Sequence, residues 1–203
     1  MPISFESSET RLNLMRAFAG ESQARNRYVF AAAAAKKEKL EVIRQVFLLT
    51  AGQEEAHAKV FYSLLTPLSG ENLVADGTFP VDIFSETLEH LRAAHHNEMQ
   101  EFSDVYPAFS KTATEEGFEN VADAFTRIGA IEKTHADRFA HLSELLKSGK
   151  LFLSEVETGW ICLHCGTIVT ATMAPPKCPV CQHDQGYFVR LAFSPFLCPG
   201  CFS

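Results

Sequence analysis

Hydrophobic residues recur in alternating steps of three and four positions along four long stretches of the first 150 residues. This spacing places them on one face of an α-helix, and its repetition is typical of helices that pack side by side in a bundle. The pattern therefore predicts a mainly α fold. The inward-facing positions of the four predicted helices run from Leu14 to Ala31, from Leu40 to Leu64, from Phe84 to Val105 and from Val121 to Leu146.

The connections between these stretches indicate how the helices pair. The first passes through Lys36–Lys39 and the third through Glu115–Asn120, and both are short enough to join antiparallel neighbours. The second, Thr66–Pro80, is longer and contains two prolines and two glycines. Two hairpins joined by one long crossover form the ferritin-like version of a four-helix bundle. Gly149 is expected to end the last helix.

Glutamate interrupts the apolar face of every predicted helix, and histidine interrupts two of them. A buried carboxylate without a partner costs several kcal/mol, and five would exceed the roughly 5 to 15 kcal/mol that keeps a typical domain folded. No lysine or arginine occupies the inward-facing positions, so we expect two metal ions to supply the positive charge. The inward-facing polar residues are Glu21, Glu54, His57, Glu98, Glu101, Glu132 and His135.

The spacing of these residues supports the same interpretation. In Glu54-x-x-His57 and Glu132-x-x-His135, the two side chains of each pair lie on one helix face and converge on one ion. Two such pairs, with a glutamate from each of the other two helices, match the di-iron carboxylate arrangement. Oxygen and imidazole ligands suit iron or manganese, and the sequence does not choose between them. The alternative is a different helix phase, in which each glutamate faces solvent.

The two hairpins resemble each other with an offset of one residue. Tyr28 follows Glu21 by seven positions, whereas Tyr106 follows Glu98 by eight. The extra residue predicts a π-type bulge in the third helix that turns Glu101 inward as a further carboxylate. Either tyrosine could be an ordinary core aromatic or a phenol hydrogen bonded to a ligand carboxylate, and the sequence leaves both interpretations open.

All six cysteines lie in the last quarter of the chain, which indicates a second module. Two C-x-x-C pairs can present four thiolates to one zinc or iron ion, and aromatic residues around them favour iron over a structural zinc ribbon. Disulfides would be unusual for closely spaced cysteines in a cytosolic protein. The four predicted ligands are Cys162, Cys165, Cys178 and Cys181.

Composition and charge narrow the function classes further. The chain has 203 residues, of which 46% are hydrophobic, enough for one core and a small satellite domain. With 18 basic and 25 acidic residues the net charge is -7, which argues against nucleic acid or an anionic membrane as a partner. No stretch approaches the roughly 18 apolar residues of a membrane helix, and Glu6 and Glu9 do not fit a signal peptide. These features predict a soluble, cytoplasmic protein.

Over about residues 5–192 the chain resembles the rubrerythrin family, in which a ferritin-like di-iron bundle precedes a rubredoxin-like iron domain. The resemblance implies a peroxidase that reduces hydrogen peroxide to water in oxidative-stress defence. It also implies that Glu101 and His57 exchange as ligands when the di-iron site is reduced. The residues that carry it are Glu21 with Tyr28, the Glu54–His57 and Glu132–His135 pairs, Glu98 and Glu101 with Tyr106, and the four predicted cysteine ligands.

The resemblance further implies a homodimer in which the thiolate iron of one subunit feeds the di-iron site of the other. The external reductant would be rubredoxin or an NAD(P)H-dependent reductase. Two alternatives remain at this point, a ferroxidase that stores iron and a structural zinc protein. The expected domains are a di-iron domain at 1–150, a rubredoxin-like domain at 155–192 and a tail at 193–203, in which Cys198 and Cys201 have no assigned role.

Overall fold

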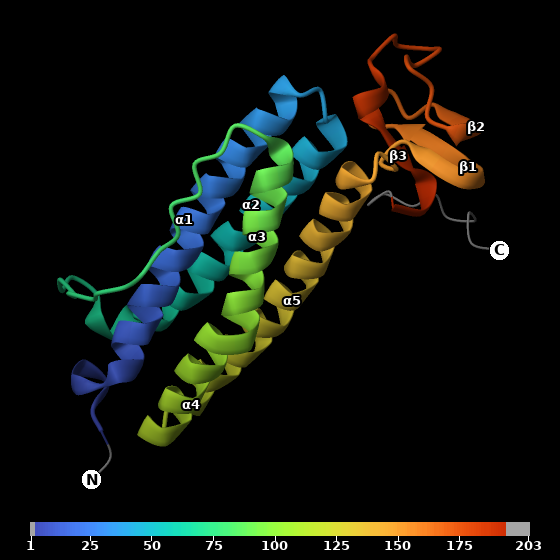
Figure 1. The fold of residues 1–203 in the computed structure, drawn as a ribbon. Coiled ribbons are helices and arrows are strands. Elements are labelled where there is room, and N and C mark those ends of the chain that lie inside the picture. Colours follow the sequence, from blue (N-terminus) through green and yellow to red (C-terminus); the bar gives the residue numbers. More distant parts are fainter. Residues whose placement is uncertain (1–2, 194–203) are drawn as a thin grey trace.

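Four long helical columns form the body of the protein in a computed structural model that describes residues 3–193 (Figure 1). Two helical hairpins pack against each other, and the third column is divided into two helices by a π-helical segment. The elements are α1 (Glu9–Lys37), α2 (Glu41–Leu64), α3 (Thr87–Gln100), the π-helical segment Glu101–Val105, α4 (Tyr106–Glu116) and α5 (Glu119–Lys147). The predicted mainly α, ferritin-like fold is confirmed.

The ends of the helices follow from local chemistry. The Ser8 hydroxyl accepts a hydrogen bond from the backbone N–H of Arg11 and so caps the start of α1. At the far end of the bundle, α5 stops before Gly149, which has a φ of +68°. This left-handed conformation carries little steric cost for glycine, so the predicted helix end at Gly149 is confirmed.

The third column contains the predicted π-type irregularity. The π-helical segment Glu101–Val105 joins α3 to α4 without a break, so the extra residue is absorbed between Glu98 and Tyr106. The predicted start of this column at Phe84 is wrong. Phe84 lies in the crossover with 38% of its surface exposed, and α3 begins at Thr87, where the Glu38 carboxylate accepts hydrogen bonds from the Thr87 N–H and hydroxyl.

The crossover between α2 and α3 is longer than the sequence suggests. After a short 3₁₀ turn at Thr66–Leu68, residues 69–86 run along the bundle without helix or strand. Two arginines of α1 hold this segment, because Arg16 pairs with Asp76 at 2.8 Å and Arg27 pairs with Asp82 at 2.9 Å. The crossover therefore joins the two hairpins while remaining fixed to the first of them.

Two apolar clusters fill the bundle and leave a polar layer between them. One contains Tyr28, Phe47 and Phe139, and the other contains Phe61 and Phe125. All of these aromatic side chains are buried. The inward-facing glutamates and histidines lie on the same helices between the two clusters, so apolar packing separates them from water at both ends.

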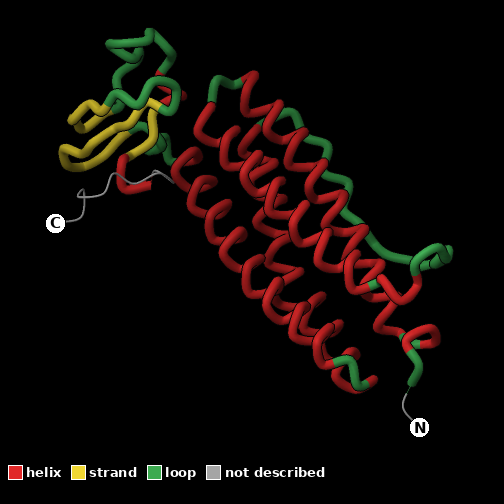
Figure 2. Tube along the Cα trace, turned by 180° about the vertical axis from the view of Figure 1, so that it is seen from behind, coloured by secondary structure: helices red, strands yellow, loops and turns green. Residues whose placement is uncertain are grey.

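A small β module follows the bundle and sits beyond the end at which α1 turns into α2 and α5 stops (Figure 2). Its strands are β1 (Leu153–Cys162), β2 (Ile168–Met173) and β3 (Phe188–Arg190), which form an antiparallel sheet in the order β2-β1-β3. Trp160 and Phe188 form its core together with Cys162 and Cys178. Among residues 3–193, no helix has the length and apolar character required to span a bilayer.

Candidate metal centres

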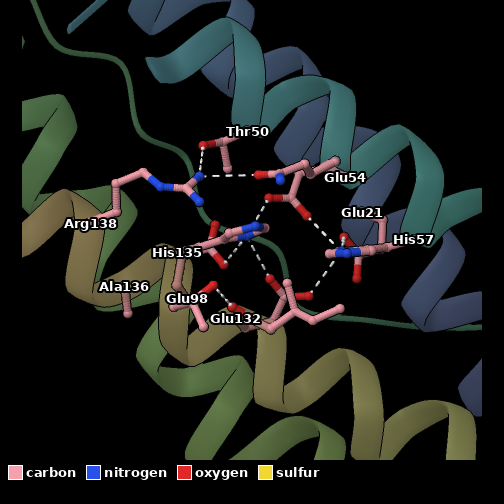
Figure 3. Close-up of polar contacts among 12 residues, drawn as sticks. Glu21, Thr50, Glu54, His57, Glu98, Glu132, His135, Ala136 and Arg138 are labelled. Carbon is pink, nitrogen blue, oxygen red and sulfur yellow. Dashed lines mark hydrogen bonds and ion pairs between the residues drawn. The ribbon is translucent and has the colours of Figure 1, made fainter. Parts of the chain in front are cut away.

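The polar layer of the bundle brings six of the predicted residues together from four helices (Figure 3). Each of the six side chains belongs to a residue with at most 7% of its surface exposed, so the cluster is shielded from solvent. The helix register predicted from the sequence is therefore correct at all six positions. The residues are Glu21 of α1, Glu54 and His57 of α2, Glu98 of α3, and Glu132 and His135 of α5.

Two glutamates are shared between two neighbouring groups of ligand atoms. His57 Nδ1 lies 3.1 Å from one oxygen of Glu54 and 3.0 Å from one oxygen of Glu132. His135 Nδ1 lies 3.0 Å and 2.9 Å from the other oxygens of the same two carboxylates. Glu21 completes the group around His57, and Glu98 completes the group around His135. The arrangement offers two adjacent positions with Glu54 and Glu132 between them.

The unsatisfied polar atoms of this cluster fit bound cations. Five carboxylate oxygens and both ring nitrogens of His135 are buried without a hydrogen-bond partner, although the ion-pair distances are short. Such orphaned atoms are costly unless something neutralises them. In each group, one ligand atom from each of four residues lies within 4.8 Å of the others, and oxygen with imidazole nitrogen is a donor set suited to iron or manganese.

The two predicted tyrosines connect the hairpins around this cluster. The Tyr28 hydroxyl donates to Glu98 Oε1, and the Tyr106 hydroxyl donates to Glu21 Oε1. Burial and the nearby carboxylates raise the pKa of both phenols well above the ordinary range, so each remains a hydrogen-bond donor. Of the two interpretations left open by the sequence, the structure therefore shows phenols bonded to carboxylates of the cluster.

Glu101 lies beside the cluster but outside both groups of converging ligand atoms. It opens the π-helical segment and is partly exposed, unlike the six clustered residues. Burial of its carboxyl group, followed by the charges of Glu98 and Glu21, raises the pKa of Glu101 well above its usual range. His57, the other member of the implied ligand exchange, occupies the cluster.

The surrounding carboxylates raise the pKa of both histidines of the cluster. Burial alone would lower the pKa of His57, but contacts with Glu132, Glu21 and Glu54 outweigh it and raise the pKa to about 12. The same balance raises the pKa of His135 to about 11. The carboxylates therefore favour the protonated form of both histidines when no metal is bound.

The pKa values of two neighbouring carboxyl groups shift in opposite directions. Burial tends to raise the pKa of Glu54, but the contacts with His135 and His57 prevail and lower it to about 2. At Glu98 burial prevails and raises the pKa to about 8. The charge of the cluster thus depends on pH across the neutral range.

We expect the metal-free protein to lose unfolding free energy as the pH rises from about 6 to about 9. The raised histidine pKa values stabilise the fold below pH 6.5, and this contribution is lost towards pH 11 to 12. The raised pKa of Glu98 also lowers the unfolding free energy as the pH rises from 4.5 to about 8. The lowered pKa of Glu54 acts oppositely only as the pH falls from 4.5 towards 2. The pKa of Cys165, lowered to about 6, opposes the loss between pH 6 and pH 9, but this thiol is exposed and is one group against the two histidines and Glu98.

Metal ions displace these protons, so the melting temperature gained by adding Mn²⁺ should be larger at about pH 9 than at about pH 6. Thermal unfolding of metal-free and manganese-loaded protein at both pH values measures the difference. An increment that does not depend on pH would show that the two histidines are neutral before metal binds.

Arg138 is a part of the site that the sequence patterns missed. Its Nη1 donates to Thr50 Oγ1 at 3.0 Å and to Gln53 Oε1 at 3.1 Å, so it ties α5 to α2 beside Glu54 (Figure 3). The Thr50 hydroxyl donates to the Val46 carbonyl, which leaves its lone pairs free for the guanidinium. Arg138 lies outside the apolar face, and its place one helical turn after His135 is the signal that could have found it.

The four predicted cysteines of the β module converge on one point, and none of them forms a disulfide. The Sγ atoms of Cys162 and Cys181 are 3.7 Å apart, and those of Cys165 and Cys178 are 3.5 Å apart. Hydrogen bonds from the Thr167 hydroxyl and backbone N–H lower the pKa of Cys165 to about 6, which favours the thiolate that a metal requires. Four thiolates suit zinc or a single iron ion. Cys198 and Cys201 lie outside the described residues.

Comparisons with known proteins agree with this pair of centres. The Rubrerythrin family model matches residues 13–143, and the model of the rubredoxin-like domain of rubrerythrins matches residues 160–189. The matched ranges contain all six clustered residues of the bundle and all four converging cysteines. The two domain types account for a di-iron centre in the bundle and a four-cysteine iron site in the module.

Individual relatives resemble the chain over nearly its whole length. Rubrerythrin of Porphyromonas gingivalis is 45% identical and that of Nitratidesulfovibrio vulgaris 38%; the matches cover 91% and 94% of this chain and 91% and 98% of the relatives. A mixed-valent nigerythrin structure aligns with a TM-score of 0.60 at 28% identity, covering 89% of this chain and 86% of that one. The family match over more than half of the sequence and these identities show that the chain belongs to the rubrerythrin family.

Proposed function

We propose that the protein is a non-haem di-iron peroxidase that reduces hydrogen peroxide to water in oxidative-stress defence. The single observation that supports this most strongly is the presence of two different centres on one chain, a carboxylate and histidine cluster and a four-thiolate site. The thiolate site suits one-electron transfer, which a turnover enzyme needs and an iron store does not. Peroxide reduction would take place in a di-iron domain at 1–150, and electron transfer would take place in a rubredoxin-like domain at 155–192.

The residues of the bundle would prepare the site for this reaction. Two bound ferrous ions would supply the two electrons that convert hydrogen peroxide and two protons into two water molecules. We assign Glu54 and Glu132 to both ions, Glu21 and His57 to one, and Glu98 and His135 to the other. Tyr28 and Tyr106 would hold the outer glutamates in place, and the apolar clusters on either side would limit the entry of water.

A change of ligands is part of the proposed cycle. We assign to Glu101 and His57 the exchange that occurs in the family. Glu101 lies in the π-helical segment with its carboxyl group buried beside the cluster but outside both groups of ligand atoms, while His57 belongs to one of them. The local hydrogen-bond pattern of a π segment is a common place for such a movement.

The relay would operate between subunits of a homodimer. The turn Gln185–Tyr187 of the β module contacts its own bundle where α2 begins at Glu41, and Glu54 lies 13 residues further along α2, which is about 20 Å at the rise of an α-helix. In the proposed dimer, the thiolate site of one subunit would lie beside the di-iron site of the other. The external reductant would be rubredoxin or an NAD(P)H-dependent reductase, and the cytoplasm would keep the thiolates reduced.

Metal analysis and a stopped-flow peroxide reaction on anaerobically prepared protein test the proposal. We expect about three iron ions per chain, two in the bundle and one at the cysteines. Mixing fully reduced protein with hydrogen peroxide should restore the visible absorption of the ferric thiolate site. Oxidation of ferrous iron by dioxygen without this response would indicate a ferroxidase, and a colourless site filled with zinc would indicate a structural protein.

A further inference from the structure

The β module makes a close backbone contact with the bundle at Gly186. This glycine lies in the short 3₁₀ turn Gln185–Tyr187 and is buried against the connection between α1 and α2. A Cβ atom at position 186 would lie 1.8 Å from the carbonyl oxygen of Lys39 and 2.9 Å from its carbon. Both are backbone atoms, so no side-chain rotation could make room for it. Even alanine would force the two surfaces apart.

The bundle side of this contact is held firmly. Lys39 has a φ of +60°, and its N–H donates to the carbonyl of Lys36. The next N–H, that of Leu40, donates to the carbonyl of Ala35, and α2 begins at Glu41. The connection between the helices therefore cannot move away from a larger residue without breaking the end of α1.

Two further sets of contacts fix the module. Lys39 Nζ lies 3.2 Å from Asp184 Oδ2, close to Gly186. Arg190 donates to the carbonyl of Lys150 in the link after α5 and to that of Leu153 at the start of β1, and Phe152 packs against apolar clusters of both the bundle and the module. The link restrains one edge, so the contact at Gly186 determines the orientation of the module about it.

We propose that Gly186 is a positioning residue that docks the thiolate module on its own bundle and so sets the place from which electrons leave it. This inference rests on the proposed peroxidase function. Electron transfer slows steeply with the separation of two centres, so a module that rotates about the link would place the thiolate iron at many distances from its acceptor. A docked module holds the thiolate iron at a single distance from its acceptor. Glycine at position 186 allows the backbones to come close enough for this docking.

The variant Gly186→Ala tests the proposal in the iron-loaded protein. We expect the visible spectrum and iron content to stay unchanged, because none of the hydrogen bonds of the four cysteines in the described residues involves position 186. Cleavage by trypsin in the link 148–152 should become faster, and oxidation of the reduced thiolate iron by peroxide should slow by roughly ten-fold or more. Gly52→Ala is the control, because a Cβ at this exposed helical position has no atom within 4 Å.

A second pair of variants tests the docking of the module even if Gly186→Ala fails to fold. Lys39→Asp opposes Asp184 with a like charge from the bundle side, in a residue type that tolerates a positive φ. We expect link cleavage to rise by about two- to five-fold, and the charge swap Lys39→Asp with Asp184→Lys to reverse most of this rise.

The results separate the docking role from the proposed function. Unchanged link cleavage in Gly186→Ala, or faster cleavage with an unchanged rate of electron transfer, would overturn the positioning role. If wild-type protein shows no peroxide-dependent oxidation of its thiolate iron, the peroxidase proposal fails and the positioning role fails with it. The cleavage measurement would still show whether the module is docked.

Discussion

Replacing Glu54 by glutamine is expected to abolish peroxide reduction, with a fall in rate of roughly 1,000-fold or more. Glu54 offers one oxygen to each of the two groups of ligand atoms, so its loss affects both metal positions at once. The amide has nearly the same shape but no charge. Iron bound in the bundle should fall from about two ions per chain to less than one, while the thiolate iron remains.

The neighbouring residue provides a matched control. Glu55→Gln removes the same charge one position along α2, but Glu55 points outward, and its side chain is 66% exposed beside Arg25. Metal content and peroxide turnover should stay within about two-fold of wild type, because exposed ion pairs contribute little. Full iron loading and normal turnover in Glu54→Gln would disprove the assignment of Glu54 to both ions.

The inward-facing glutamates and histidines could be predicted because helical periodicity leaves few choices. Once Leu14 and Phe61 are taken as core residues, steps of three and four place Glu21 and His57 on the same faces. The one-residue offset between the hairpins also predicted the π-helical segment, because an extra residue in a helix that keeps its buried face must be absorbed locally. Both predictions use only the spacing of residues within each helix, compared between the hairpins in the second case.

Features that depend on two segments distant in the sequence were harder to predict. The Tyr106 hydroxyl donates to Glu21, 85 positions away, and nothing in the local pattern around either residue fixes that direction. Gly186 resembles any turn glycine until the backbone of Lys39 is placed against it. Phe84 fits the helical pattern because it is apolar, although the crossover leaves it partly exposed. Tertiary packing decided all three cases.

Replacing Cys165 by alanine is expected to separate the two halves of the proposed cycle. Cys165 is the exposed member of the four-cysteine cluster, so its removal leaves no cavity in the core of the module. With three thiolates the site should lose its iron or hold it weakly, and the visible absorption of the ferric form should disappear. Turnover supported by an external reductant should fall by roughly 100-fold or more.

The bundle of this variant should still react. A single turnover with peroxide, after chemical reduction of the protein, should proceed at a rate close to that of wild type, because Glu54, Glu132 and the two histidines are unchanged. The double variant Cys198→Ser with Cys201→Ser is the control and should retain both the spectrum and the turnover. Loss of colour in that control would mean that the tail supplies thiolates, whereas undiminished steady-state turnover in Cys165→Ala would show that electrons reach the bundle without the thiolate iron.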